Sequence, residues 1–478
     1  MPPTVALGLC ILLVIFLLRL ERKQSRSVSL SLWLPTIWTF YCASRPVSGW
    51  FVSGSLSEGP NAIEEGSAPD RFFLSALIVC GFVALARAKL KWSEVLKENR
   101  WLVLLYAYMG VSILWSDYPW ISFKRWIKVF GSLLMALVVL AEASPLSALE
   151  AILRRSAYVL IPFSLLLTKY FPDLGVQYDR WLGKKMWVGV TTQKNCLGRL
   201  CLISIFFLLW SLYRKWKSGA LRPLKPPILA DVVVLLLSMW LLMRPSLFAI
   251  SATGIVSLGL GISMFILMAW IKRRWRHPRF NFIRAIAVVG MGLGIAIPLV
   301  GGSDLEGLVS LLGRDVTFTG RTDIWAVLVP IAWRHPLFGL GYGGFWVNPP
   351  VPWAWLNESH NGYLEVFLEL GIVGLFLLLG FLFSFCSNAQ RALARHFDWA
   401  AFGICLLLIA LFHNITEASL VRASSHLWTI LLFLGVLMAR LSRTTPALKE
   451  SPAPLPRSRV NPALTEKNLK APALHSSG

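Results

Sequence analysis

Residues 363–385 read YLEVFLELGIVGLFLLLGFLFSF, and the only charged residues among them are Glu365 and Glu369. A helix needs about 20 mostly apolar residues to cross the hydrocarbon core of a bilayer. This stretch therefore predicts a membrane-spanning helix. The whole chain agrees, because 56% of its 478 residues are hydrophobic and 15% are charged, whereas soluble domains carry about 25% charged residues. We expect an all-α, polytopic membrane protein.

Similar apolar runs recur along the chain and predict about 12–13 transmembrane helices within a transmembrane domain of residues 1–443. The first run is not typical of a signal peptide, because its positive charges follow the apolar stretch instead of preceding it. Residues 444–478 are rich in Pro, Ala and Ser and predict a disordered cytoplasmic tail. The predicted spans are residues 4–18, 29–44, 72–88, 101–116, 126–143, 156–171, 190–212, 228–243, 246–270, 282–301, 363–385, 399–416 and 425–441.

The positive charge of the chain is distributed over alternate connections between these spans. The formal net charge is +23, and 31 of the 47 Lys and Arg residues fall in alternate connections and the C-terminal tail. Cytoplasmic loops of membrane proteins are enriched in Lys and Arg. The distribution therefore predicts an external N-terminus, a cytoplasmic C-terminus and a large external loop at residues 302–362. It argues against a nucleic-acid-binding protein, whose basic residues would form one patch.

The large external loop contains an amphipathic segment followed by a glycine-rich stretch. Ile324, Leu328 and Ile331 recur at helical spacing, which predicts a helix on or in the membrane surface, and Pro330 should kink it or end it early. Residues 335–346 read HPLFGLGYGGFW, in which the glycines permit a tight backbone path. A dinucleotide-binding loop is a poor interpretation, because no strand–turn–helix pattern surrounds these glycines.

His360 and Asn361 lie where this loop meets the next predicted span. A histidine with a pKa near neutrality is suited to proton transfer, so His360 is a candidate general base, with Asn361 beside it as a candidate substrate contact. A solvated loop histidine is the alternative. Glu417, near the external end of the twelfth span, is a second candidate catalytic residue that could orient a histidine or an arginine. It could equally be a charge at a helix end.

Several basic residues, among them both Lys194 and Arg199, fall on the side that is otherwise poor in positive charge. Charges at membrane depth usually face a protein interior or a wet cavity, and arginine binds phosphate oxygens as a fork. Together these residues predict a diphosphate-binding site. For any one of them, an interfacial anchor or an ion pair with Asp117, Glu417 or Asp323 is an equal alternative. The candidate substrate-binding residues are Arg321, Arg244, Lys194 and Arg125.

The loop resembles that of the O-antigen ligase and polymerase superfamily. The likeness rests first on His360-Asn361, followed after nine residues by Gly371 and after two more by Gly374. Gly320-Arg321 with Trp325, the stretch at residues 335–341 and Trp115-Ser116-Asp117-Tyr118-Pro119 are also similar to elements of that family. Residues 189–198 resemble a stretch of its exopolysaccharide-polymerase branch. The resemblance runs from about residue 100 to residue 420.

This resemblance implies a GT-C-like fold, no metal and no other cofactor. It implies a bacterial inner-membrane enzyme that takes a glycan from undecaprenyl diphosphate and transfers it to a glycan or lipid-linked acceptor within membrane lipid. His360 would be the base and Arg321 a diphosphate contact. Ligases of the family often carry an arginine where this chain has Ser251-Ala252-Thr253. This departure favours a polymerase over a lipid A–core ligase, although Arg244 lies nearby in the sequence.

Two other classes of protein fit parts of the pattern. A transporter or flippase of lipid-linked sugars would use the same basic cavity without a base at its mouth, and a membrane scaffold would need neither. The aromatic, glycine and histidine elements of the external loop favour the enzyme. Cationic side chains at the leaving diphosphate would make a bound metal unnecessary, and the sequence has no cysteine–histidine cluster with zinc spacing.

Overall fold

The computed structural model of the chain describes an α-helical membrane protein with one short β-hairpin. All described helices belong to one unit, Met1–Ser442, and the predicted tail lies outside the described residues. The structure describes residues 1–25, 28–50, 67–178, 183–220, 225–243, 251–275, 280–300, 320–353 and 356–443.

The helices follow the predicted spans in order. Up to the hairpin they are α1 (Pro3–Gln24), α2 (Trp33–Ala43), α4 (Ala68–Arg87), α5 (Trp92–Glu98), α6 (Arg100–Val111), α7 (Pro119–Leu140), α8 (Pro145–Tyr170) and α9 (Pro172–Gly175). Strands β1 (Val176–Tyr178) and β2 (Lys185–Trp187) pair antiparallel, with Gln177 opposite Met186. Then come α10 (Lys194–Lys217), α11 (Pro226–Met243), α12 (Ala252–Arg274), α13 (Phe282–Val300), α15 (Arg321–Ala332), α16 (Gly362–Ala392), α17 (Phe397–His413) and α18 (His426–Leu441).

Eight of the described helices are long and apolar enough to cross a membrane: α1, α4, α8, α10, α11, α12, α13 and α16. Shorter apolar helices cover residues 100–115, 397–413 and 426–441. Each predicted span therefore coincides with a helix, but α2 has only 11 residues. At 1.5 Å per residue it rises about 17 Å, roughly half the hydrocarbon thickness. The predicted span at residues 29–44 is thus a short helix preceded by a 3₁₀ turn.

Two helices begin well before their predicted spans. The span predicted from residue 126 is α7, which starts at Pro119, and the span predicted from residue 156 is α8, which starts at Pro145. Charged residues interrupt both apolar runs. In α8 they are buried inside the protein, where Arg154 pairs with Asp231 and Arg155 with Glu21. A hydropathy pattern scores such paired charges as the end of a span, although they lie within it.

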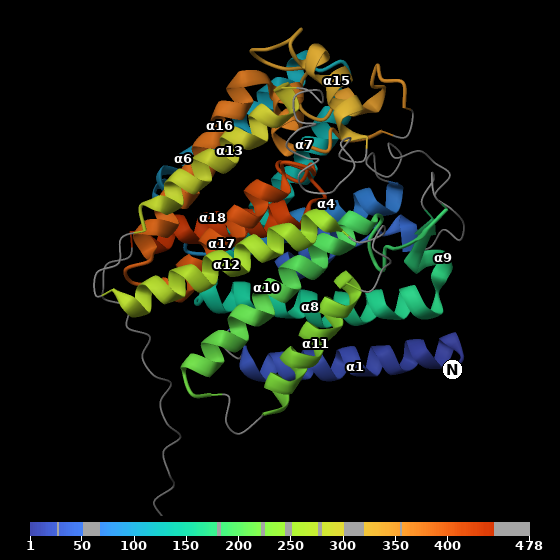
Figure 1. Cartoon of the computed structure of the whole chain (residues 1–478), viewed down its shortest axis with the longest axis vertical. Coiled ribbons are helices and arrows are strands. Elements are labelled where there is room, and N and C mark those ends of the chain that lie inside the picture. The colour runs from blue at the N-terminus through green and yellow to red at the C-terminus, as the bar shows by residue number, and fades with distance from the viewer. Residues whose placement is uncertain are drawn as a thin grey trace, which may run out of the picture. The chain divides into compact units, whose positions relative to one another are not determined.

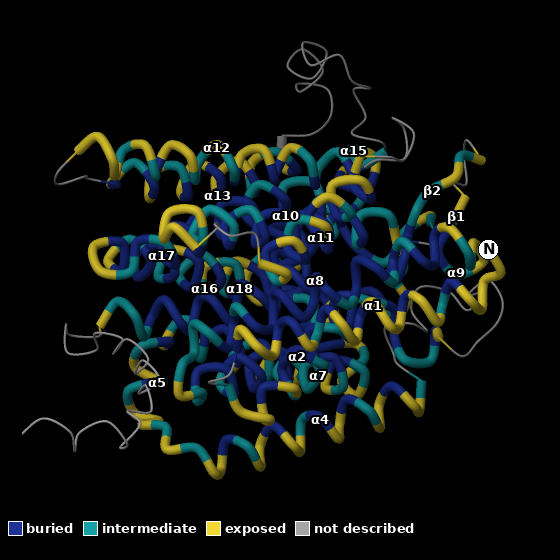
Figure 2. Tube along the Cα trace, turned by 90° about the horizontal axis from the view of Figure 1, so that it is seen from below, coloured by how far each residue is buried: buried dark blue, intermediate teal, exposed yellow. Residues whose placement is uncertain are grey.

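The helices pack in neighbouring groups (Figure 1). Helices α1, α8, α10 and α12 lie side by side, while α6 and α13 both flank α16. Figure 2 shows α8, α10, α17 and α18 as largely buried and α1, α4 and α12 with exposed positions along their length. The exposed positions of these outer helices are mostly apolar, such as Leu12 and Val79, as expected for helices that face lipid.

Helix α15 confirms the helix predicted in the large loop. Ile324 and Leu328 are buried in a cluster with Phe367 and Leu368 of α16, so these two residues of the apolar stripe pack against protein. A location on or in the membrane surface stays a prediction. Pro330 lies inside the helix, which ends two residues later at Ala332. Residues 302–319 of the predicted loop lie outside the described residues.

Candidate active site

Three helices begin around one cavity of about 680 Å³. Helices α10, α16 and α18 supply lining residues from their first turns, and Arg125 and Lys128 of α7, the C-terminal end of α2 and the loops after Gly341 and Leu356 complete the wall. The N-terminus of a helix carries unpaired N–H groups and a partial positive charge. Helix starts that converge on a cavity therefore favour an anionic ligand.

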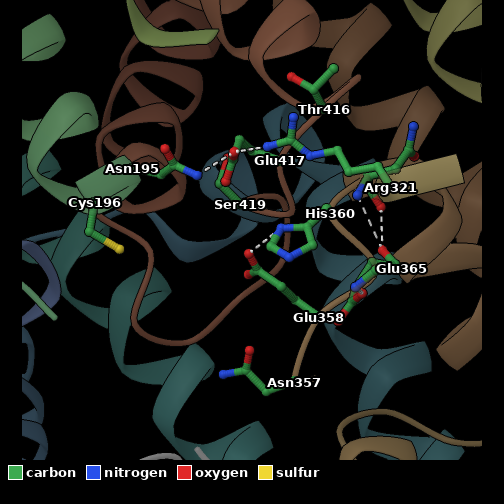
Figure 3. A network of polar contacts seen from close by, with 12 residues as sticks. Asn195, Cys196, Arg321, Asn357, Glu358, His360, Glu365, Thr416, Glu417 and Ser419 are labelled. Atoms are coloured by element: carbon green, nitrogen blue, oxygen red, sulfur yellow. Dashed lines mark hydrogen bonds and ion pairs between the residues drawn. The ribbon is translucent and has the colours of Figure 1, made fainter. Parts of the chain in front are cut away.

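His360 lies on the wall of this cavity in contact with a carboxylate. Its Nδ1 is 2.9 Å from Oε1 of Glu358, and the other carboxylate oxygen of Glu358 pairs with the guanidinium of Arg422. Figure 3 shows the imidazole between Glu358 and the Arg321–Glu417 pair. We refer to His360, Glu358, Arg422, Arg321 and Glu417 as the histidine centre. It combines a titratable base with a fixed negative partner and two arginines.

Backbone strain is concentrated at the same place. Among the described residues, the non-glycine residues with positive φ are His360 (54°) and Val421 (58°), and both line the cavity. Such conformations cost on the order of 1–3 kcal/mol and cluster at functional sites. The strain at Val421 places Arg422 beside Glu358, and the hydroxyl of Tyr342 donates a 2.8 Å hydrogen bond to the Val421 carbonyl.

The charges of the centre shift its pKa values. Burial would raise the pKa of Glu358, but His360 and Arg422 outweigh burial and hold it well below its usual range. Burial disfavours a charged imidazole, but the Glu358 carboxylate outweighs it and raises the pKa of His360. Burial raises the pKa of Glu417, and Arg321 and His360 offset this only in part. Glu358 therefore stays ionised and stabilises a proton on His360.

Arg321 and Glu417 form a second ion pair next to His360. Nη2 of Arg321 lies 2.5 Å from Oε1 of Glu417, and Nδ2 of Asn195 donates a 2.7 Å hydrogen bond to the same oxygen. Glu417 is almost fully buried, so it orients Arg321, which is one of the two roles foreseen for it. The ion-pair alternative for Arg321 is thereby confirmed, and the pair still places a guanidinium beside the histidine.

The glycine-rich stretch and the histidine signature fold as one unit. Helix α16 breaks at Gly371, whose φ of 63° is left-handed, and the loop at residues 335–341 docks into the break. The amides of Leu340 and Gly341 donate to the carbonyls of Leu368 and Glu369, at 3.1 and 2.9 Å, and the Ile372 amide donates to the Pro336 carbonyl at 2.8 Å. A side chain at Gly371 would collide with the Leu337 backbone. The tight path predicted for these glycines is confirmed, and it fixes the part of α16 that precedes Gly371.

Asn361 has a structural role in place of the predicted substrate contact. Its side-chain oxygen accepts hydrogen bonds from the amides of Tyr363 and Leu364, at 2.9 and 2.8 Å, and so caps α16. Its Nδ2 donates to the carbonyls of Gly294 and Ile415, at 3.0 and 2.9 Å. The side chain is fully buried, and these four bonds use its hydrogen-bonding capacity.

The other candidate cationic residues differ in their position relative to the cavity. Arg125 lines the cavity and its Nη1 donates a 2.6 Å hydrogen bond to the Gly343 carbonyl. Lys194 begins α10, but among the described residues the lining includes Gln193 and Cys196 on either side of it and not Lys194 itself. Its place is taken by Arg199, which lines the cavity and donates a 2.9 Å hydrogen bond to Sγ of Cys196. Arg244 lies outside the described residues.

Sequence reasoning did not single out Glu358 or Arg422 as site residues, and it noted Arg199 among the basic residues but chose Lys194 from this stretch. Glu358 is two residues before His360, so a search for carboxylates around the histidine would have found it. Arg422 follows the twelfth span on the side that is poor in positive charge, and this was an available signal. Arg199 stands one turn beyond Asn195 on α10, where only the phase of the helix separates it from Lys194.

The centre also has a donor set that could hold a metal. One ligand atom from each of Glu358, His360 and Glu417 lies within 4.8 Å of the others. Both carboxylates, however, are already paired with guanidinium groups, Glu358 with Arg422 and Glu417 with Arg321. A divalent cation would have to displace or repel these arginines, so the residues present fit a metal poorly.

The fold thus places a buried histidine–carboxylate pair at a cation-lined cavity of a polytopic membrane protein. Residues 247–379, which include α15, the glycine-rich stretch and His360, match the model of the family described as O-antigen ligase. The chain is also similar to the exopolysaccharide production protein ExoQ of Rhizobium meliloti (strain 1021), at 27% identity over 323 residues, with 64% of this chain and 70% of that protein covered. Both similarities support the likeness to the O-antigen ligase and polymerase superfamily that the sequence motifs indicate.

Proposed function

We propose that this protein polymerises or ligates glycans carried on undecaprenyl diphosphate, by direct transfer of the sugar to an acceptor hydroxyl. The observation that supports this best is the pairing of His360 with Glu358 on the wall of a cavity that Arg199 and Arg422 also line. A base and a set of cations are the two requirements of this reaction.

In the proposed step, Nε2 of His360 removes the proton from the acceptor hydroxyl. The acceptor oxygen bonds to the anomeric carbon as the bond from that carbon to the diphosphate oxygen breaks, and the leaving lipid diphosphate keeps the electron pair. The Glu358 carboxylate holds the ring through Nδ1, at 2.9 Å, and stabilises the imidazolium that forms, as carboxylates do for catalytic histidines.

The leaving diphosphate needs positive charge at the oxygens where negative charge develops. Arg199 and Arg422 line the cavity, Arg321 lies beside His360, and the starts of α10, α16 and α18 add their partial charges. Arginine forks suit phosphate oxygens. Because these same arginines occupy the carboxylates of Glu358 and Glu417, the proposed reaction is independent of a metal.

The distribution of charge along the helices supports an external site in the inner membrane. Helices α10, α16 and α18 begin at the cavity and end in basic residues, such as Arg214, Arg391 and Arg440. Basic residues favour the cytoplasmic side, so we place the cavity and the N-terminus outside and the C-terminus inside. Labelling a cysteine introduced at Phe280 from outside intact cells would contradict this orientation.

A polymerase fits better than a lipid A–core ligase. Ala252 stands where ligases often carry an arginine, and the similar protein from Rhizobium meliloti is described as an exopolysaccharide production protein. The position begins α12, and the neighbouring Thr253 binds Thr416 through a 2.9 Å hydroxyl contact.

The test is incubation of the purified protein with an undecaprenyl-diphosphate-linked oligosaccharide. We expect growth of the lipid-linked glycan, with one undecaprenyl diphosphate released for each unit transferred. Movement of the intact lipid-linked sugar across a vesicle membrane without transfer would establish a flippase and overturn the proposal. A catalytically silent protein that only binds the lipid would also overturn it.

A further inference from the structure

The cavity continues past His360 along α16 as far as Leu370. The side chains that line it there differ from those of the histidine centre. This part, which we name the inner lobe, is lined by Tyr41, Arg125, Lys128, Glu369 and His426. From Asn361 to Glu369 the helix rises about 12 Å, at 1.5 Å per residue. A ligand that fills the lobe and also reaches His360 is therefore extended.

His426 points to a ligand that forms hydrogen bonds. It is 95% buried, and neither of its ring nitrogens has a hydrogen-bond partner within the part of the chain that the structure describes. Leaving a buried polar group without a partner is unfavourable. Because His426 lines the cavity, a ligand in the lobe can supply both a donor and an acceptor to its ring.

Glu369 adds to the lobe a carboxyl group that lies outside the histidine centre. It is 92% buried and lines the cavity. Glu365, one turn earlier on α16, has its carboxylate occupied by Nε1 of Trp346, at 2.6 Å, and the Ser359 amide, at 2.8 Å. The Glu369 carboxyl group accepts a hydrogen bond from the Gly343 amide, and its remaining oxygen lone pairs can bind a ligand hydroxyl.

Two cationic side chains and an aromatic ring complete the lobe. The ammonium group of Lys128 lies 5.4 Å from the ring centre of Tyr41, and Arg125 is fixed to the Gly343 carbonyl. The lobe therefore contains hydrogen-bond donors and hydrogen-bond acceptors together. This mixture suits a neutral ligand with many hydroxyl groups, whereas the arginines around His360 suit an anion.

We propose that the inner lobe binds the hydroxyl groups of a sugar chain, with Glu369 and His426 as its principal hydrogen-bonding residues. This inference rests on the proposed function, because a glycan bound here would extend from the reacting sugar at His360. The chain could belong to the acceptor or to the donor, and the kinetics of the two substrates distinguish them.

The test uses Glu369→Gln and His426→Ala in the purified full-length protein, with KM measured separately for acceptor and donor. We expect one of the two KM values to rise about 10- to 100-fold, since each variant loses a hydrogen bond to a charged or buried group. His426→Gln should restore part of the loss, because its amide can again donate and accept. Glu142→Gln is the matched control, since Glu142 binds Ser29 just beyond the other end of α7.

Binding of a free oligosaccharide, without lipid or diphosphate, separates this inference from the proposed function. The wild type could bind the sugar but transfer nothing, while the variants lose binding. That result would support the inference about the inner lobe and overturn the proposed transferase function. Unchanged KM values and unchanged oligosaccharide binding in both variants would overturn the inference. A loss of kcat alone would also overturn it, because it would place the two residues in the chemical step.

Discussion

The histidine centre and a second buried ion-pair cluster lie towards opposite ends of α10. The second cluster, which we name the α8–α11 network, consists of Glu150, Arg154, Lys215 and Asp231. Asp231 pairs with Arg154 at 3.2 Å and with Lys215 at 2.6 Å, and Glu150 pairs with Arg154 at 3.1 Å. Both clusters bury charge, but they differ in what surrounds the charge.

The α8–α11 network is closed within regular helices. Asp231 is fully buried and also accepts a 2.6 Å hydrogen bond from the hydroxyl of Tyr158, and Arg154 binds Ser211. The histidine centre instead stands on loops and helix starts, contains a strained residue and opens onto a cavity. Buried charge therefore does not by itself identify a reactive site. Strain and an open cavity next to the charge separate the two clusters.

The largest expected effect is that of His360→Ala. We expect glycan transfer to fall about 10²–10⁴-fold, because the base is lost, while membrane insertion and donor binding survive. Transfer and donor binding are measured on the same purified variant. His396→Ala is the control, because His396 precedes α17 at the end remote from the cavity. If His360→Ala transfers at near the wild-type rate, the base is Glu417 or the acceptor needs none.

In the α8–α11 network, Asp231→Asn should lower the stability of the fold and leave the rate of glycan transfer by the folded protein unchanged. Removing one partner of a buried ion pair costs roughly 3–5 kcal/mol of unfolding free energy, because Arg154 and Lys215 keep their charges. Thermal unfolding in detergent, with kcat per folded molecule, checks this expectation. A selective loss of kcat in a stable variant would show that the comparison between the clusters is mistaken.

Arg321→Ala should weaken use of the donor more than it harms folding. Because the substitution leaves Glu417 without its 2.5 Å partner, the double variant Arg321→Ala/Glu417→Gln is the matched control for stability. We expect the double variant to recover thermal stability but not the donor KM, and Arg321→Lys to rescue only partly, since it replaces a fork with a point charge. Recovery of both properties would assign Arg321 a structural role. We predict a similar loss for Arg244→Ala.

A smaller effect is expected for Glu358→Gln on the pH profile. Transfer requires neutral His360, so the rate should fall on the acid side as His360 becomes protonated. The Glu358 carboxylate raises the pKa of His360, so its removal should lower that pKa and move the acid limb to lower pH. A limb that stays in place, or moves upward, would belong to another group.

The smallest expected effect is that of a chelator. Incubation with EDTA should leave the transfer rate unchanged, because Arg321 and Arg422 already neutralise the carboxylates of the histidine centre. The control is a metal-dependent glycosyltransferase treated in parallel. Loss of activity that added Mn²⁺ or Mg²⁺ restores would show that a cation displaces these arginines.

The sequence predicted the helices better than it predicted the contacts among the site residues. Apolar runs report burial in lipid or protein, so every predicted span is a helix. Arg321 and Glu417 are 96 residues apart, and no local pattern records that they meet. Asn361 was assigned to substrate, although an asparagine directly before an apolar helix is typical of an N-cap. Lys194 and Arg199 both suggested a basic wall, and only the direction of each side chain around α10 separates them.

The break at Gly371 has a consequence for protein engineering. Backbone hydrogen bonds join residues 336–341 to Leu368, Glu369 and Ile372. They hold the loop against α16 on both sides of the break at Gly371. A chimera that keeps its own α16 but takes a loop of different length or glycine spacing would misplace these amides and carbonyls. The exchangeable cassette is therefore the whole stretch from His335 to Gly374, with His360 carried inside it.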